Sequence, residues 1–237
     1  MSRSLGREPM KFESHKHQSP RTELVLVRHA SSTRAQEGLW GRLYDAPLAQ
    51  GYQAQLRQTR RDLGGFDGQK VLSSPLLRCT QTAEHLFPQS QVELVPEFRA
   101  YHSGELESVT EEYVAREHPG YLQLSYGERF LCPRFNEESV ELQILRVARG
   151  LHRVLQSNEQ FLLIVTHYST LNIIANLGAR SWDTQLHAGG VYNVAFAGYL
   201  RIAIDPRIIL GDIESNLGNM VQARVNEHWT GESYGVW

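Results

Sequence analysis

Glu23-Leu-Val-Leu-Val-Arg-His29 is a short, continuous apolar run that ends in two polar residues. A second run of the same kind, Phe161-Leu-Leu-Ile-Val-Thr-His167, lies in the second half of the chain. Runs of this length and composition are typical of strands that are buried on both faces of a parallel sheet. In such sheets, ligands bind beyond the carboxyl ends of the strands. Because a histidine ends each run, the sequence predicts that His29 and His167 share one site.

Strand-like and helix-like patterns alternate through the rest of the chain. Short strands are predicted at residues 71–73 and 91–95. Helices are predicted at residues 48–63, 74–87, 136–155 and 168–178, and a β-hairpin at residues 190–204. Ser74 and Pro75 are expected to begin the second helix, as its capping hydroxyl and its first helical residue. This alternation predicts an α/β fold, a three-layer α/β/α sandwich with a largely parallel central sheet.

The predicted organisation is a single domain over residues 21–237, preceded by a flexible tail at residues 1–20. Residues 97–136 are rich in aromatic side chains, are interrupted by glycine and proline, and show no steady period. We interpret this segment as an inserted cap or lid. The segment after Pro206 has no pattern that assigns its structure. The tail is basic and lacks the apolar core of a signal peptide.

Composition argues against several classes of partner. Of the 237 residues, 41% are hydrophobic and 21% are charged, which is ordinary for a globular protein. The formal net charge of −2 argues against binding to nucleic acid or to an anionic membrane. No apolar run approaches the roughly 20 residues of a membrane helix. Cys79 and Cys132 show no metal-binding or disulfide spacing, which favours a cytoplasmic location. The sequence leaves open whether the chain forms a homodimer.

Four sequence motifs occur together in an order that resembles a known family. They are Arg28-His29-Ala30, Gly41-Arg-Leu-Tyr-Asp-Ala-Pro-Leu48, Ser73-Ser-Pro-Leu-Leu-Arg-Cys-Thr-Gln-Thr-Ala-Glu84 and Val165-Thr166-His167. This set resembles the motifs of the histidine phosphatase superfamily, of the phosphoglycerate mutase-like type (branch 1). The resemblance implies the phosphoglycerate mutase-like fold and an enzyme that transfers phosphoryl groups without a metal or other cofactor.

The resemblance also implies roles for four residues. His29 is the nucleophile that becomes transiently phosphorylated, and His167 donates a hydrogen bond to the phosphoryl oxygens. Arg28 and Arg78 bind the phosphoryl group. These side chains suit the roles, because guanidinium groups are permanently charged and bind phosphate oxygens in pairs. Catalysis of phosphoryl transfer rests mainly on such positioning and on stabilisation of charge.

The proton donor to the leaving group is less well specified. By resemblance the donor is Glu97, which follows the third predicted strand. However, Glu97 and Gly104 are seven positions apart, where the family pattern has about four. Glu105 and Glu107 are therefore alternative donors. A carboxylic acid of raised pKa is a common proton source in enzymes.

Two more residues are candidates for the site. Arg34 lies a few positions after the first histidine and is a candidate phosphate ligand. Tyr168 follows His167, where glycine is common in the family, and its ring is expected to narrow the pocket or to contact the substrate.

These features favour a phosphomonoester hydrolase that acts on a small phosphorylated metabolite through a phosphohistidine intermediate. A phosphoglycerate mutase-like mutase would use the same residues, but Pro96-Glu97-Phe98-Arg99 lacks the asparagine that mutases carry next to the acid. A catalytically weak module that binds phosphate esters or a protein is the third alternative. It is suggested by Ala30, which replaces the glycine of the family signature, and by the irregular acid segment.

Overall fold

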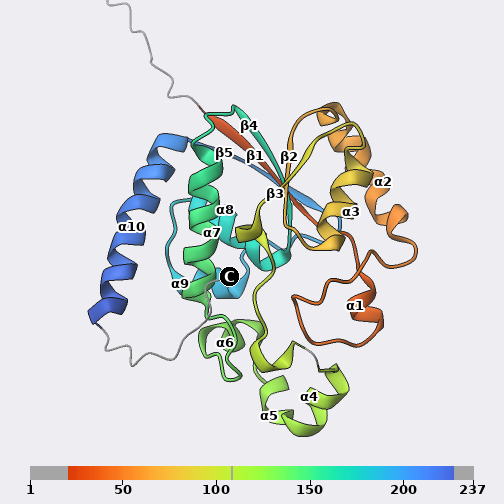
Figure 1. Ribbon diagram of the computed structural model, residues 1–237, viewed down its shortest axis with the longest axis vertical. Coiled ribbons are helices and arrows are strands. Elements are labelled where there is room, and N and C mark those ends of the chain that lie inside the picture. The colour runs from red at the N-terminus through yellow and green to blue at the C-terminus, as the bar shows by residue number, and fades with distance from the viewer. Residues whose placement is uncertain (1–20, 108, 227–237) are drawn as a thin grey trace, which may run out of the picture.

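The protein is built around a five-stranded sheet with helices on both faces (Figure 1). The structure is a computed structural model that describes residues 21–107 and 109–226, so the predicted tail at residues 1–20 lies outside the described residues. The strands are β1 (Thr22–Arg28), β2 (Val71–Ser73), β3 (Val92–Leu94), β4 (Phe161–Thr166) and β5 (Tyr199–Ile204). Their order in the sheet is β3-β2-β4-β1-β5.

The sheet is mostly parallel, which brings the two histidine-terminated strands together. β1 pairs with β4, and β2 pairs with β4 and β3, all in parallel. Among the described strands only β5 is antiparallel, and it pairs with β1. Arg28 at the end of β1 is in register with Thr166 at the end of β4, so His29 and His167 follow at the same edge. The predicted three-layer sandwich with a largely parallel sheet is confirmed.

Two layers of helices cover the sheet. α2 (Tyr52–Leu63) and α3 (Leu77–Leu86) pack on one face, and α7 (Val140–Leu155) and α8 (Tyr168–Gly178) pack on the other. α10 (Pro206–Asn226) lies beside α7 (Figure 1). The shorter helices are α1 (Thr33–Gln36), α4 (Glu111–Glu117), α5 (Pro119–Leu122), α6 (Tyr126–Leu131) and α9 (Thr184–Gly189), with 3₁₀ turns at Gly64–Phe66, Pro96–Phe98 and Gly104–Leu106.

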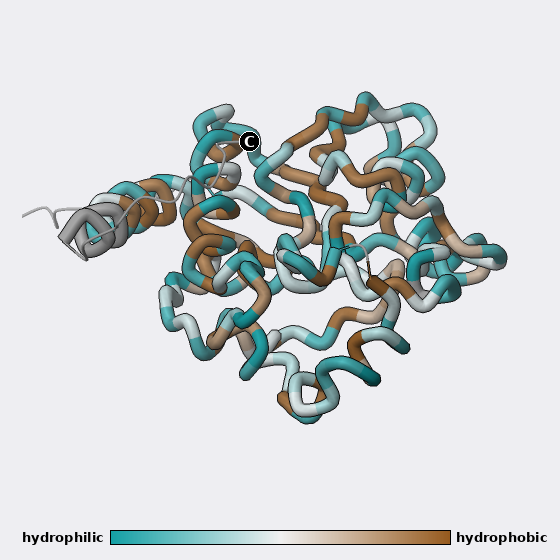
Figure 2. Tube along the Cα trace, turned by 60° about the horizontal axis from the view of Figure 1, so that its bottom comes forward, coloured by the Kyte–Doolittle hydropathy of each residue, from teal (hydrophilic) through white to brown (hydrophobic). Residues whose placement is uncertain are grey.

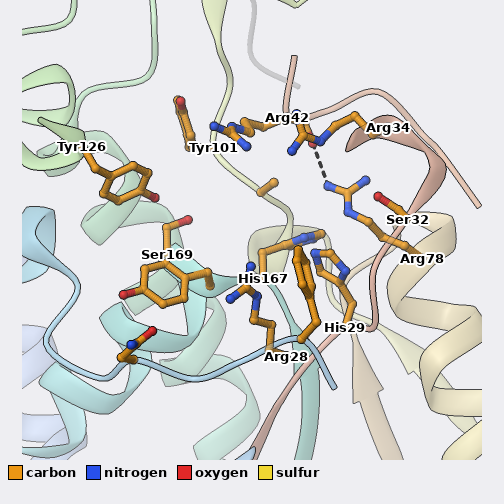
Figure 3. Close-up of a pocket in the computed structure, with 14 residues that line it drawn as sticks. Arg28, His29, Ser32, Arg34, Arg42, Arg78, Tyr101, Tyr126, His167 and Ser169 are labelled. Atoms are coloured by element: carbon orange, nitrogen blue, oxygen red, sulfur yellow. Dashed lines mark hydrogen bonds between the residues drawn. The ribbon is translucent and has the colours of Figure 1, made fainter. Parts of the chain in front are cut away.

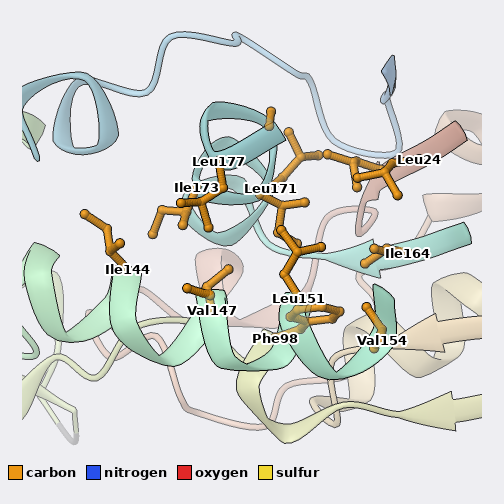
Figure 4. Packing of buried hydrophobic residues seen from close by; sticks show 14 of the residues in the cluster. Leu24, Phe98, Ile144, Val147, Leu151, Val154, Ile164, Leu171, Ile173 and Leu177 are labelled. Carbon is orange, nitrogen blue, oxygen red and sulfur yellow. The ribbon is translucent and has the colours of Figure 1, made fainter. Parts of the chain in front are cut away.

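Alternate residues of the central strands face the two helical layers, because successive side chains of a strand point to opposite faces. On β1, Val25 and Val27 pack with α2 and α3, whereas Leu24 and Leu26 pack with α7 and α8 (Figure 4). All four side chains are fully buried. Figure 2 shows hydrophobic segments mostly in the interior of the molecule and hydrophilic ones mostly in the outer parts.

Leu151→Ala is expected to destabilise the fold by about 2–5 kcal/mol, because it removes a fully buried side chain of α7 and leaves a cavity. The measurement is urea unfolding at neutral pH. Leu142→Ala on the same helix is the matched control, since Leu142 is 42% exposed, and it should change the free energy of unfolding by no more than about 0.5 kcal/mol. Equal losses for the two variants would contradict this account of the core.

Two predicted elements are wrong. Residues 190–204 do not form a hairpin: β5 pairs with β1, which is distant in sequence, and residues 191–198 form a loop. Ser74 does not cap α3, which begins at Leu77 with Leu76 at its N-cap. The Ser74 hydroxyl instead contacts His167 on the neighbouring strand end. In both cases a long-range partner replaces the local one that the sequence pattern suggested.

Residues 97–136, the cap segment, lie outside the sheet and contain α4, α5 and α6. Part of this segment has its own small hydrophobic cluster, in which Leu106, Val114 and Tyr121 pack with Trp40 from the loop after α1. None of the helices in residues 21–107 and 109–226 has both the length and the apolar sequence that a membrane span requires.

Candidate active site

A pocket of about 330 Å³ lies at the carboxyl ends of β1 and β4 (Figure 3). The strand ends and the helices that follow them form its base, and the loops around α1, the cap segment and the loop before β5 form its walls. Its lining residues are Arg28, His29, Ser32, Arg34, Arg42, Arg78, Ala100, Tyr101, Tyr126, His167, Tyr168, Ser169, Asn193 and Phe196. The pocket therefore brings together the four residues to which the family motifs gave roles, and also Arg34 and Tyr168.

His29 is held in an orientation that suits a nucleophile. Its backbone amide donates to the carbonyl of Thr166 on β4, at 2.9 Å, which fixes the residue beside the neighbouring strand. Its Nδ1 lies 2.6 Å from the carbonyl oxygen of Ala30. Because a carbonyl only accepts, this contact places the proton on Nδ1 and leaves the lone pair on Nε2. The residue is 8% exposed, so it is shielded but open to the pocket.

His167 lies next to His29, with 5.1 Å between the ring centroids. Its Nε2 is 2.8 Å from the hydroxyl of Ser74, which accepts a hydrogen bond from the amide of Leu76. The Ser74 hydroxyl can donate to Nε2, and the ring proton then lies on Nδ1. In that tautomer His167 is a hydrogen-bond donor beside His29, which is what a phosphoryl oxygen would need.

Both imidazoles have pKa values well below the usual 6.5. Burial is the main cause in each case, and the charge of Arg78 is the next. Both rings are therefore neutral at pH 7. A neutral ring is the nucleophilic form of histidine, so the arginines that surround His29 also keep it reactive.

The stability of the fold is expected to decrease as the pH falls below about 6.5. The unfolded chain protonates both histidines near their usual pKa of 6.5, whereas the folded chain resists protonation, so acid favours unfolding. The measurement is the urea midpoint between pH 7.5 and pH 5. A variant that carries His29→Asn and His167→Asn should show a smaller pH dependence. An unchanged dependence would assign the effect to other groups.

Arg28 and Arg78 are held by backbone carbonyls. Arg28 donates to the carbonyl of Val194 at 2.8 Å, and its guanidinium carbon lies 3.9 Å from the ring centre of Phe196. Arg78 donates to the carbonyls of Tyr44 and Arg42, at 3.0 and 2.7 Å. Carbonyl contacts orient a guanidinium without neutralising its charge. Both side chains therefore remain available to an anion in the pocket.

Arg34 and Arg42 also line the pocket, and they lie on the side away from Arg28 (Figure 3). Arg34 donates to the carbonyl of Leu39 at 2.6 Å, and Arg42 lines the pocket together with Tyr101. Burial, reinforced by the neighbouring guanidinium groups, lowers the pKa of Arg34 to about 10, so Arg34 remains a cation at neutral pH. Arg42 was not singled out from the sequence, although it lies inside the second family motif.

The three candidate proton donors lie outside the pocket, and each carboxylate already has a partner. Glu97 pairs with Arg153 of α7 at 2.6 Å. Glu105 is exposed and accepts from the side-chain amide of Asn136 at 2.6 Å. Glu107 accepts from the backbone amides of Leu43 and Ser103, at 2.9 and 2.5 Å, and so joins the loop after α1 to the cap segment. None of the three side chains lines the pocket.

Ala100 stands where a donor would be expected. It lies four positions before Gly104, the spacing that the family pattern has for its acid, and it lines the pocket. Arg146 fixes this stretch of backbone, donating to the carbonyl of Arg99 at 3.1 Å and to the carboxylate of Glu138 at 2.7 Å. Ala100 therefore occupies the position that faces the pocket, and the candidate donor Glu97 lies three positions earlier in the chain.

The remaining candidate, Tyr168, forms part of the wall. Its hydroxyl donates to the carbonyl of Gly190 at 3.2 Å, and its ring lies 5.0 Å from the Arg28 guanidinium. It therefore helps to position Arg28 and narrows the pocket. Among residues 21–107 and 109–226, no group of three or more histidine, cysteine, aspartate or glutamate side chains is arranged to hold a metal ion.

A mostly parallel sheet with paired histidines at its carboxyl edge is the architecture of the phosphoglycerate mutase-like proteins. The chain belongs to the histidine phosphatase superfamily (branch 1), whose family model matches residues 24–199. The resemblance recognised in the sequence motifs is thereby confirmed. A comparison with curated proteins gave no significant match.

Several solved structures share the fold. A mycobacterial glucosyl-3-phosphoglycerate phosphatase is 17% identical, with a TM-score of 0.66 over 77% of this chain and 90% of that chain. A putative α-ribazole-5′-P phosphatase from Escherichia coli is 22% identical, with a TM-score of 0.65 and the same coverage. A mutant phosphoserine phosphatase from Entamoeba histolytica, in complex with phosphoserine, is 18% identical, with a TM-score of 0.60 over 76% of this chain and 89% of that chain.

Proposed function

We propose that this protein is a phosphatase that hydrolyses small phosphorylated metabolites through a phosphohistidine at His29. The observation that carries the proposal is the neutral His29 ring beside His167, within a pocket that also holds Arg28 and Arg78. A nucleophile, a hydrogen-bond donor and two cations are the groups that transfer of a phosphoryl group to histidine requires. The volume of the pocket suits a small ligand.

The proposed reaction has two steps. Nε2 of His29 attacks the phosphorus atom and displaces the leaving group, while Arg28 and Arg78 bind the equatorial oxygens and His167 donates to one of them. Water then attacks the phosphohistidine and releases inorganic phosphate. The guanidinium groups supply the positive charge that metal ions supply in many other phosphoryl-transfer enzymes, so we propose that turnover needs no metal.

The similar structures support a phosphatase. The three described above are named as phosphatases of small phosphorylated compounds. A mutase is less well supported, because Pro96-Glu97-Phe98-Arg99 lacks the asparagine that mutases carry next to the acid.

The proposal is tested by measuring phosphate release in the presence of a chelator. The substrates are p-nitrophenyl phosphate and a panel of sugar, glycerate and amino-acid phosphates. We expect release that survives the chelator, and a phosphorylated protein that can be trapped by rapid quenching at high pH. Folded protein that releases no phosphate and never becomes phosphorylated would be the binding module considered above, and the proposal would then be abandoned.

A further inference from the structure

The pocket lacks the acid that cleavage of an ordinary phosphate ester requires. None of its lining residues is an aspartate or a glutamate, among the residues that the structure describes. Three carboxylates act electrostatically on its arginines, and none of them lines the pocket. Asp45 accepts from the amide of Leu77 at 2.5 Å, Glu107 binds two backbone amides, and Glu111 is exposed at the start of α4. An alkoxide that leaves from phosphorus would find no carboxylic acid beside it.

The pocket also contains more positive charge than one phosphoryl group needs. A phosphoryl group carries up to two negative charges, and Arg28 and Arg78 together match them. Arg34 and Arg42 are two further cations in the same pocket. No ion pair found among the described residues includes any of these four side chains. Arg34 hydrogen-bonds to the carbonyls of Leu39 and Trp40, and neither Arg34 nor Arg42 has an ion-pair partner among the described residues, so their charges remain available for a second anionic group.

We propose that the substrate is a phosphoanhydride, a small organic diphosphate, whose leaving phosphate departs as an anion bound by Arg34 and Arg42. This inference rests on the proposed function and specifies its substrate class. It explains two independent features of the pocket with one ligand. An anhydride needs no proton donor, and its second phosphate needs the two additional cations.

The chemistry balances without an acid. Nε2 of His29 forms a bond to the terminal phosphorus, and the bond from that phosphorus to the bridging oxygen breaks. The electron pair of that bond stays on the leaving monoester, whose conjugate acid has a pKa near 6, against roughly 16 for water as a model of an alcohol. Water then attacks the phosphohistidine, its oxygen bonds to phosphorus, the electron pair returns to Nε2, and both protons stay on the dihydrogen phosphate that forms.

The hydroxyl groups in the pocket are poor substitutes for a carboxylic acid. Burial raises the pKa of Tyr126 above the usual range, so its hydroxyl gives up a proton less readily than that of a free tyrosine. The hydroxyl of Tyr168 donates to the carbonyl of Gly190 at 3.2 Å. That contact holds Tyr168 in the wall of the pocket.

Ethyl diphosphate and ethyl phosphate form a pair of probes, because the group that leaves the attacked phosphorus is ethyl phosphate in the first and ethoxide in the second. A general acid contributes roughly 10²- to 10⁴-fold to a rate, so we expect kcat/KM to be at least about 100-fold higher for the diphosphate. The reference substrate is p-nitrophenyl phosphate, whose leaving group is good but carries no second phosphate. Release of inorganic phosphate is measured throughout.

Arg34→Gln and Arg42→Gln test the assignment of the second phosphate. Each is expected to lower kcat/KM for ethyl diphosphate at least tenfold more than for p-nitrophenyl phosphate. Arg57→Gln, an exposed arginine on α2, is the matched control for loss of one charge. Equal losses on the two substrates would overturn the proposal.

Ala100→Glu tests the missing acid by restoring it. This variant should raise hydrolysis of ethyl phosphate at least tenfold, and Ala100→Gln, of the same size but without a titratable proton, should not. Thermal unfolding establishes that both variants are folded. If wild-type protein cleaves ethyl phosphate as fast as ethyl diphosphate, a donor exists and this inference is wrong, while the proposed function stands. If no substrate is cleaved and His29 is never phosphorylated, the proposed function itself fails.

Discussion

His29→Ala is expected to reduce turnover at least about 10⁴-fold, because in the proposed mechanism the His29 ring supplies the nucleophilic nitrogen. The neighbouring ring, His167, is a poor replacement. Its Nε2 is already hydrogen-bonded to the Ser74 hydroxyl. The residual rate of the variant would measure what the arginines contribute by electrostatic stabilisation alone.

The measurement is single-turnover phosphate release, combined with quenching to detect phosphorylated protein. Wild-type protein should form a phosphorylated species that is lost in acid and stable in base, and the variant should form none. His152→Ala is the matched control, because His152 lies on α7 and contacts Glu214. A His29→Ala variant that turned over at the wild-type rate would refute the phosphohistidine mechanism.

Arg78→Lys is expected to reduce kcat/KM about 10²- to 10³-fold, although it conserves the charge. The Arg78 guanidinium donates to the carbonyls of Tyr44 and Arg42 and lines the pocket at the same time. Lysine has a single ammonium group on a flexible stem and cannot hold this geometry while binding two phosphoryl oxygens. Part of the loss in kcat/KM would come from disorder in the loop after α1, because the carbonyls of Tyr44 and Arg42 belong to that loop.

Inhibition by inorganic phosphate distinguishes two roles of Arg78, binding of the phosphoryl group and support of the loop after α1. If Arg78 binds the phosphoryl group directly, we expect the inhibition constant for phosphate to rise in proportion to the loss in kcat/KM. Arg57→Lys, on the exposed face of α2, should behave as wild type. Unchanged inhibition together with full activity would show that the Arg78 guanidinium only supports the loop.

The sheet and the base of the pocket could be predicted because they depend on local patterns. An apolar run that ends in histidine predicts both a buried strand and a polar side chain at its carboxyl end. The two runs that end in His29 and His167 follow this rule, and the structure places the two imidazole rings 5.1 Å apart. Arg78 follows β2 in the same way, at the start of α3. The positions of these residues at one edge of the sheet depend on the strands, so they can be predicted without knowing how the loops fold.

The walls of the pocket could not be predicted, because they depend on contacts between distant segments. Glu97 lies near the expected place in sequence, but it pairs with Arg153 on α7 and does not line the pocket. Arg42 and Tyr101 of the cap segment line the same pocket although they are far apart in sequence, which no local pattern shows. Pro206–Asn226 form α10, whose Ile209 and Ile213 are buried in the main core, although no sequence pattern predicted a structure there.

The division between sheet and cap segment has a consequence for how this protein can evolve. Arg28, His29 and His167 lie at strand ends that the core holds in place, and Arg78 lies at the start of α3. By contrast, Arg34 lies on the short helix α1, Arg42 in the loop after it, and Tyr101 in the cap segment. In the proposed reaction these walls bind the leaving group, so mutations there would change which leaving group is accepted while the strand ends stay as they are. New substrates would then arise by drift in the loops, while the chemical step is inherited unchanged.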